Sequence, residues 1–145
     1  MIGDEIPKYF DVYGVSRDNS IVIGSGVLEA LGLRKARDID LVVSGDEFAR
    51  LAESEKFEPD QTKDCLWGGL DMPRKIEVWR DWTSPTTDEP VDFDDLLKYS
   101  TEIDGVKYVT PDYLLGWKQS KNREKDQADV ILLRNFLNQQ GAKNE

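Results

Sequence analysis

Residues 21–43 constrain the fold more than any other part of the chain, because they predict a strand, a tight turn, a helix and a second strand in close succession. Residues 21–23 are apolar and predict a short buried strand. Gly24-Ser25-Gly26 then breaks this strand, and a helix is expected over residues 27–31. Residues 38–43 predict the next strand. This alternation indicates an α/β layer structure, and 145 residues are expected to form a single domain, residues 1–145.

The strand predicted over residues 38–43 begins with two acids that alternate with apolar residues. Successive side chains of a strand point to opposite faces, so Asp38 and Asp40 would share one face. Near a core, two such charges repel each other and lose hydration, whereas a bound divalent cation reverses both effects. An exposed strand end with solvated acids is the alternative, and the sequence leaves the two interpretations equally open.

Two further features could complete a site around these aspartates. Gly24 and Ser25 stand between a strand and the start of a helix, where free backbone N–H groups favour phosphate oxygens, although most turns of this kind bind nothing. Glu77 lies in the predicted strand 75–79, where an acid is more often an outward-facing residue. If that strand lies beside the aspartates, three carboxylates can hold two metal ions for an in-line phosphoryl transfer. A site for divalent metal and a nucleoside triphosphate is therefore one hypothesis.

The composition limits the other kinds of site. The chain has no histidine and one cysteine, so a zinc site or a histidine-based triad is close to excluded, and any metal must be held by oxygen. A net charge of −10 makes a broad nucleic-acid surface less favourable. No apolar run approaches the length of about 20 residues that spans a bilayer, and no signal peptide is evident, so a soluble cytoplasmic protein without a membrane partner is expected.

The remaining segments carry four expectations about local structure. Residues 57–72 are ambiguous, with an edge strand near residues 65–67, and residues 83–90 read as a loop. Asp104-Gly105 predicts the turn of a hairpin. Asn122 is expected to cap a last helix that ends at Gly141.

The combined pattern resembles the nucleotidyltransferase superfamily whose best-known fold is that of DNA polymerase β. The family pattern is an apolar residue, Gly, and Gly or Ser, then Asp-apolar-Asp/Glu-apolar, and later an apolar-acid-apolar strand. Its counterparts here are Ile23-Gly24-Ser25, Asp38-Ile39-Asp40-Leu41 and Ile76-Glu77-Val78. The C-terminal VTPDYLLGWKQSKNREKDQADVILL looks like the helical end of small bacterial members. The resemblance covers residues 21–137, with a gap between 57 and 74, and implies a mixed β-sheet flanked by helices, with helices at the C-terminus.

The resemblance implies a role for each matching residue. Gly24 and Ser25 would cradle the triphosphate, while Asp38 and Asp40 would bind Mg²⁺ or Mn²⁺. Glu77 would complete the metal site and assist deprotonation of the acceptor hydroxyl. The basic residues that would neutralise phosphate, or would otherwise lie on the surface and balance nearby acids, are Arg34, Arg37, Lys118, Arg123 and Lys125.

A minimal member of this superfamily would be a metal-dependent nucleotidyltransferase that moves a nucleoside monophosphate from an NTP to a hydroxyl. The acceptor would be a small molecule, as in enzymes that inactivate antibiotics, or a protein. The alternative is a catalytically inactive module that binds a nucleotide or a partner, for example one half of a toxin–antitoxin pair. Two departures bear on this choice: Glu77 stands where many members have Asp, and there is no room for a separate helical domain. A homodimer or a protein partner is therefore expected to complete the site.

Overall fold

A seven-stranded mixed sheet forms the centre of the molecule, with the strand order β3-β4-β5-β2-β1-β9-β8. The computed structural model describes residues 4–69 and 72–143. The strands of this sheet are β1 (Ser20–Ile23), β2 (Ile39–Val43), β3 (Glu58–Pro59), β4 (Leu66–Gly68), β5 (Ile76–Trp79), β8 (Ser100–Ile103) and β9 (Val106–Val109). Strand β2 runs parallel to β5, and β1 runs parallel to β9, whereas the other neighbours are antiparallel. A separate hairpin joins β6 (Asp81–Thr83) to β7 (Pro90–Asp92).

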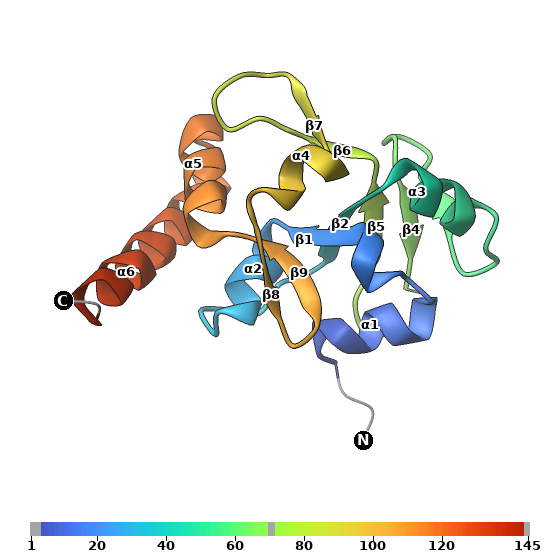
Figure 1. The fold of residues 1–145 in the computed structure, drawn as a ribbon, viewed down its shortest axis with the longest axis horizontal. Helices are drawn as coiled ribbons and strands as arrows, with labels where there is room; N and C mark the ends of the chain where they lie inside the picture. The colour runs from blue at the N-terminus through green and yellow to red at the C-terminus, as the bar shows by residue number, and fades with distance from the viewer. Residues whose placement is uncertain (1–3, 70–71, 144–145) are drawn as a thin grey trace.

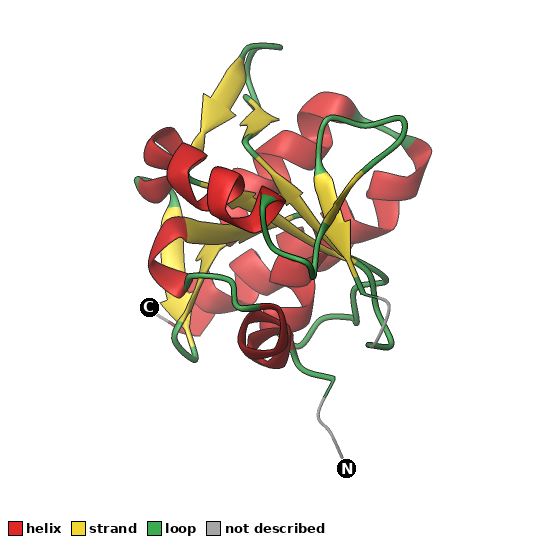
Figure 2. Ribbon diagram, turned by 90° about the vertical axis from the view of Figure 1, so that its right-hand side faces the viewer, coloured by secondary structure: helices red, strands yellow, loops and turns green. Residues whose placement is uncertain are grey.

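Helices cover the sheet, whose strands pass through the middle of the molecule (Figure 2). They are α1 (Ile6–Tyr13), α2 (Ser25–Ala30), α3 (Gly45–Ala52), α4 (Phe93–Leu97), α5 (Pro111–Lys121) and α6 (Gln127–Lys143), with short 3-10 turns η1 (Arg17–Asn19) and η2 (Glu124–Asp126). Helices α5 and α6 pack together at one end of the molecule, and α3 lies at the opposite end (Figure 1). The predicted mixed sheet with flanking and C-terminal helices is therefore confirmed.

The hydrophobic core lies along the three central strands of the sheet. Strand β1 is buried along its whole length, and Ile39 and Leu41 of β2 and Ile76 of β5 are completely buried. Strands that are covered on both faces are expected to be almost continuously apolar, as β1 is. Acidic side chains on β2 and β5 are exceptions to this rule, so their position in the sheet calls for a chemical explanation.

Several local expectations are confirmed, and others are wrong in detail. Asp104 and Gly105 turn the hairpin of β8 and β9 with φ angles of 52° and 78°, as a tight hairpin turn with two left-handed residues requires. Strand β4 is second from the edge, because β3 pairs with its outer side. The ends of the predicted loop 83–90 belong to β6 and β7, where Thr83 pairs with Pro90.

Two expectations about the C-terminal helices are wrong. Asn122 ends α5 rather than beginning α6: its backbone has a φ of 48°, and its N–H donates to Lys118 O. Asparagine tolerates this left-handed conformation better than most residues, which suits it to a helix C-terminus. Gly141 lies inside α6, which continues to Lys143. Within the two described ranges, no helix combines the length and the apolar character needed to cross a membrane.

Candidate functional site

The register of three neighbouring strands places two of the predicted acids side by side. Ile23 of β1 pairs with Asp40 of β2, and Asp40 pairs with Glu77 of β5. Paired residues of adjacent strands project from the same face of a sheet. Asp38 directly precedes β2 and is two residues from Asp40. The structure thus brings Asp40 and Glu77 to one face of the sheet, with Asp38 just before β2, and Glu77 is buried.

The turn after β1 lies directly against the carboxylate of Asp40. Gly24 has φ 65° and ψ −142°, a conformation that residues with a side chain rarely adopt. A Cβ atom added at Gly24 would lie 3.8 Å from Asp40 Oδ2. The neighbouring Gly26 is required for a different reason, because a Cβ there would lie 2.5 Å from Val22 Cγ1 and push α2 off the sheet. Gly26 therefore lets α2 pack closely against β1, whereas Gly24 is required by its left-handed backbone conformation.

A cavity of about 510 Å³ opens beside this turn and contains all the predicted site residues except Glu77. Those residues are Gly24, Ser25, Arg37, Asp38, Asp40, Lys118, Arg123 and Lys125. The sequence interpretation left out several others that line the same space, namely Ile23, Trp82, Trp117, Asp126 and Asp129, and it gave Arg34 only an undecided role. The volume lies in the range of small-molecule and cofactor sites.

A second cavity, of about 330 Å³, adjoins the first and contains Glu77. Its remaining lining is Ile23, Asp40, Trp79, Asp81, Trp82 and Thr83. Among carboxylates of the described residues, only Asp40 lines both cavities. Asp40 therefore lies between the two cavities. The first contains the glycine turn and most of the basic residues, and the second contains Glu77.

The environment of Asp40 disfavours a negative charge. Burial of its carboxyl, followed by the negative charges of Glu77 and Asp38, raises the pKa of Asp40 to about 6. The positive charge of Lys63 acts in the opposite direction without cancelling the effect. A carboxylate with a raised pKa in a cavity is a candidate for a functional role, and a bound cation would remove the cost of its charge.

Glu77 is engaged by two lysines. Lys63 Nζ donates to Glu77 Oε1 and Oε2 at 3.0 and 3.2 Å, and Lys75 Nζ lies 3.3 Å from Oε1. The hydrogen bond to Glu77 raises the pKa of Lys63. In the part of the chain that the structure describes, no three His, Cys, Asp or Glu side chains are grouped closely enough to hold a metal ion together. Asp38 and Asp40 line the first cavity, whereas Glu77 forms salt bridges with Lys63 and Lys75.

Lys118 is buried, so of its two interpretations the one that places it on the surface is wrong. Its Nζ lies 3.1 Å from Asp126 Oδ1 and 3.0 Å from Asp129 Oδ2, and both of these acids are also buried. Arg123 Nε lies 2.6 Å from Asp126 Oδ2. Although burial opposes it, hydrogen bonds from Arg123 and Lys118 lower the pKa of Asp126. This alternation of charges fixes the positions of the cations at the cavity.

Arg34 continues this alternation to the glycine turn. Its guanidinium donates to Asp129 Oδ1 and Oδ2 at 2.7 and 2.8 Å, and its Nη2 also donates to Ser25 Oγ at 2.7 Å. The two acids that hold Arg34 and Lys118 come from η2 and α6, far along the chain from residue 34. A signal was present in the sequence: Asp126 and Asp129 are three residues apart, a spacing that places both on one side of a helix.

Two tryptophans form an aromatic wall of the first cavity. The rings of Trp82 and Trp117 stack with centroids 4.5 Å apart and an angle of 25° between their planes. Trp117 Nε1 donates to Thr83 Oγ1 at 3.0 Å, and the Arg123 guanidinium lies 5.0 Å from the centroid of Trp117. Trp82 belongs to β6 and Trp117 to α5, so no sequence spacing indicated that they meet.

No protein-family model matches the chain, and comparison with curated proteins gives no significant match. Among solved structures, the chain is similar to one described as a "putative nucleotidyltransferase" from Thermotoga maritima. The two superpose with a TM-score of 0.52 over 92% of this chain and 95% of the other, at 20% sequence identity. At this identity the likeness shows the fold alone. The chain therefore shares the fold of that protein. In this chain, Asp38 and Asp40 line the first cavity described above.

Proposed function

We propose that the protein is a metal-dependent nucleotidyltransferase, which moves a nucleoside monophosphate from an NTP to a hydroxyl of a small molecule or a protein. The observation that carries this proposal is the position of Asp40 between the two cavities. One cavity offers the glycine turn and basic side chains to a triphosphate, and the other offers Glu77 to an acceptor. The fold shared with the Thermotoga maritima protein supports the same activity.

The donor atoms at Asp38 and Asp40 fit Mg²⁺ or Mn²⁺. Both side chains line the same cavity, and the pKa of Asp40 is raised first by burial and then by the negative charges of Glu77 and Asp38, which Lys63 does not offset. Carboxylate oxygens are the ligands that these hard cations select. When bound, the cation would polarise the phosphoryl oxygens and activate the attacking hydroxyl. Glu77 would join the aspartates as a ligand only after it has lost its lysine partners.

The basic residues would hold the triphosphate against the turn. Arg34 is already oriented by Asp129 and presents its guanidinium beside Ser25. An ammonium group has three N–H donors, and the two acids that contact Lys118 leave one for a phosphate oxygen. Arg37, Arg123 and Lys125 line the same cavity and would neutralise the remaining phosphate charge.

In the proposed transfer, the acceptor oxygen attacks the α-phosphorus of the NTP. The bond between this phosphorus and the oxygen that bridges it to the β-phosphorus breaks, and pyrophosphate leaves. The proton of the acceptor hydroxyl passes to a carboxylate of the second cavity, and Glu77 and Asp40 are the candidates. The net charge of −10 makes a nucleic-acid acceptor less favourable than a small molecule or a protein hydroxyl. A homodimer or a protein partner would enlarge the acceptor side of the site.

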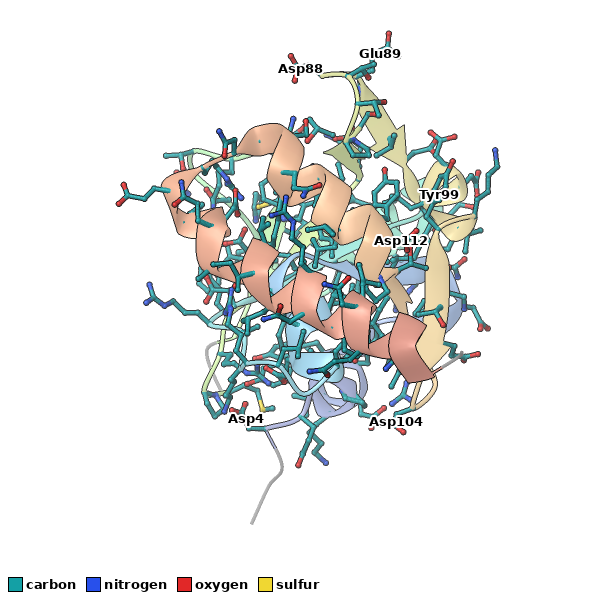
Figure 3. All side chains as sticks on the ribbon, turned by 90° about the vertical axis from the view of Figure 1, so that its left-hand side faces the viewer. Asp4, Asp88, Glu89, Tyr99, Asp104 and Asp112 are labelled. Carbon is teal, nitrogen blue, oxygen red and sulfur yellow. The ribbon has the colours of Figure 1, made fainter. Side chains whose placement is uncertain are left out.

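The proposal is tested by pyrophosphate release from each NTP with Mg²⁺, in the presence of a panel of hydroxyl acceptors. Wild type should release pyrophosphate, Asp40→Asn should lose at least about 100-fold of that rate, and Asp88→Asn should match wild type. Asp88 is a suitable control because it lies at the tip of the loop between β6 and β7, away from both cavities (Figure 3). Equal release by wild type and Asp40→Asn would contradict the proposal.

The salt bridges of Glu77 favour a second candidate, a module that binds nucleotide or a partner without turnover. Lys63 and Lys75 occupy the carboxylate that would otherwise accept the proton. Such a module, for example one half of a toxin–antitoxin pair, would be stabilised thermally by NTP and Mg²⁺ together. It would release no pyrophosphate with any acceptor, which separates it from the enzyme.

A further inference from the structure

The first cavity has two chemically different parts. Ser25, Arg34, Arg37 and Asp38 provide charged and hydroxyl groups beside the turn, whereas Trp82 and Trp117 provide an aromatic wall. Phosphates and their metal ion use the charged part. Trp117 contacts the phosphate site through the Arg123 guanidinium over its ring, but its own N–H donates to Thr83, so the wall offers an aromatic surface rather than charge and points to an additional part of the ligand.

The aromatic wall is held in place by contacts on several sides. The two indoles stack at 4.5 Å, and Trp117 is fixed by its hydrogen bond to Thr83 Oγ1. Arg123 lies over the ring of Trp117 and is itself held by two hydrogen bonds to Asp126. A base that stacks on Trp117 would therefore take the place of the Arg123 guanidinium over this ring.

We infer that the Trp82–Trp117 wall is the platform on which the nucleobase stacks, an inference that rests on the proposed function. Every base has an aromatic face, so stacking selects by ring area rather than by hydrogen-bonding pattern. The indole N–H of Trp117 is already used by Thr83, which leaves it no donor for the base edge. The site should therefore prefer a bicyclic purine nucleotide over a pyrimidine nucleotide and distinguish adenine from guanine weakly.

Trp117 is the more diagnostic of the two residues. Trp82 lines both cavities, so its replacement would affect the nucleotide and the acceptor together. Trp117 lines only the cavity that holds the glycine turn, among the two cavities described above. A Trp117 variant that binds ATP more weakly thus reports on contacts with the nucleotide and not on contacts with the acceptor.

The test is the dissociation constant of ATP, CTP and inorganic tripolyphosphate, each with Mg²⁺, for wild type, Trp117→Leu and Trp82→Phe. We expect wild type to bind ATP more tightly than CTP, with quenching of tryptophan fluorescence by ATP. Trp117→Leu should weaken ATP binding about tenfold and leave tripolyphosphate binding unchanged. Trp82→Phe keeps a ring in the stack and should give a smaller loss for ATP alone. Tyr99→Leu is the control, because Tyr99 is exposed and lies outside both cavities (Figure 3).

Tripolyphosphate separates the failure of this inference from other failures. If Trp117→Leu binds ATP and tripolyphosphate as wild type does, the nucleotide site stands and the platform is refuted. If it loses both ligands equally, the wall only supports the fold and the platform is again refuted. If none of the three ligands binds to wild type with Mg²⁺, the proposed function fails together with the inference.

Discussion

The molecule contains two sets of acids beside one cavity, and their surroundings are opposite. Asp126 and Asp129 receive ion pairs from Lys118, Arg123 and Arg34 at 2.6 to 3.1 Å. Hydrogen bonds from these cations, acting against burial, lower the pKa of both acids. Asp40 instead has a pKa raised to about 6 by burial and by neighbouring acids. The first set is neutralised within the chain, whereas the charge of Asp40 stays unfavourable, as the proposed cation site requires.

The largest effect should come from removing the cation of the neutralised set. Lys118→Met leaves two buried carboxylates without their shared partner, and breaking a buried pair in this way costs about 3–5 kcal/mol of unfolding free energy. Lys121→Met is the matched control, because Lys121 lies on the same helix, forms its ion pair with the exposed Asp88 at 3.4 Å and otherwise lies over the ring of Trp117. It should change stability by less than about 1 kcal/mol in urea unfolding. Equal effects of the two variants would contradict the account.

The opposite sign is expected at Asp40. A folded-state pKa of about 6, above the value of 3.8 for an unperturbed Asp, means that folding is penalised once the group ionises, as pH rises from about 4 to about 6. This shift lowers the free energy of unfolding by roughly 3 kcal/mol above pH 6 and leaves it unchanged below pH 4. Asp40→Asn should therefore raise the melting temperature of the metal-free protein at pH 8 and leave it unchanged at pH 3.5. A lower melting temperature of Asp40→Asn than of wild type at pH 8 would contradict the contrast between the two sets of acids.

The glycine turn beside Asp40 should show a smaller cost. Gly24→Ala forces a side chain into a conformation with φ 65°, which costs about 1–3 kcal/mol. Gly45→Ala is the control, since Gly45 lies in the first turn of α3 and an added Cβ would meet nothing within 4 Å. Thermal unfolding of the pair measures the difference, and equal melting temperatures would show that the turn is not constrained.

The smallest change in stability is expected at Lys63. Its side chain is 46% exposed, so the pair with Glu77 is screened by solvent, and Lys63→Met should cost less than about 1 kcal/mol. The same variant frees one side of Glu77 and should bind Mn²⁺ more tightly than wild type. Calorimetric titration with Mn²⁺ measures this, and unchanged or weaker binding would show that Lys63 does not compete with the cation.

The sequence was most informative where function depends on neighbouring strands. Asp40 and Glu77 each lie in a short apolar run, and such runs pair in the middle of a sheet. The salt bridge between Lys63 and Glu77 was missed, because Lys63 comes from a loop in the segment that the sequence left ambiguous. The Trp82–Trp117 stack was missed because it joins a hairpin to a helix that are distant in the chain. Asn122 was misassigned because asparagine serves at both ends of helices, and only its backbone conformation distinguishes them.

The central claim is that Asp38 and Asp40 bind a cation that the chain itself does not supply. The most direct measurement is a titration with Mn²⁺ at pH 7.5, in which electron paramagnetic resonance reports the free ion. The account predicts that wild type and Asp88→Asn bind Mn²⁺, and that Asp38→Asn and Asp40→Asn each lose at least about tenfold in affinity. Equal binding by all four proteins, or no binding by wild type, would contradict it.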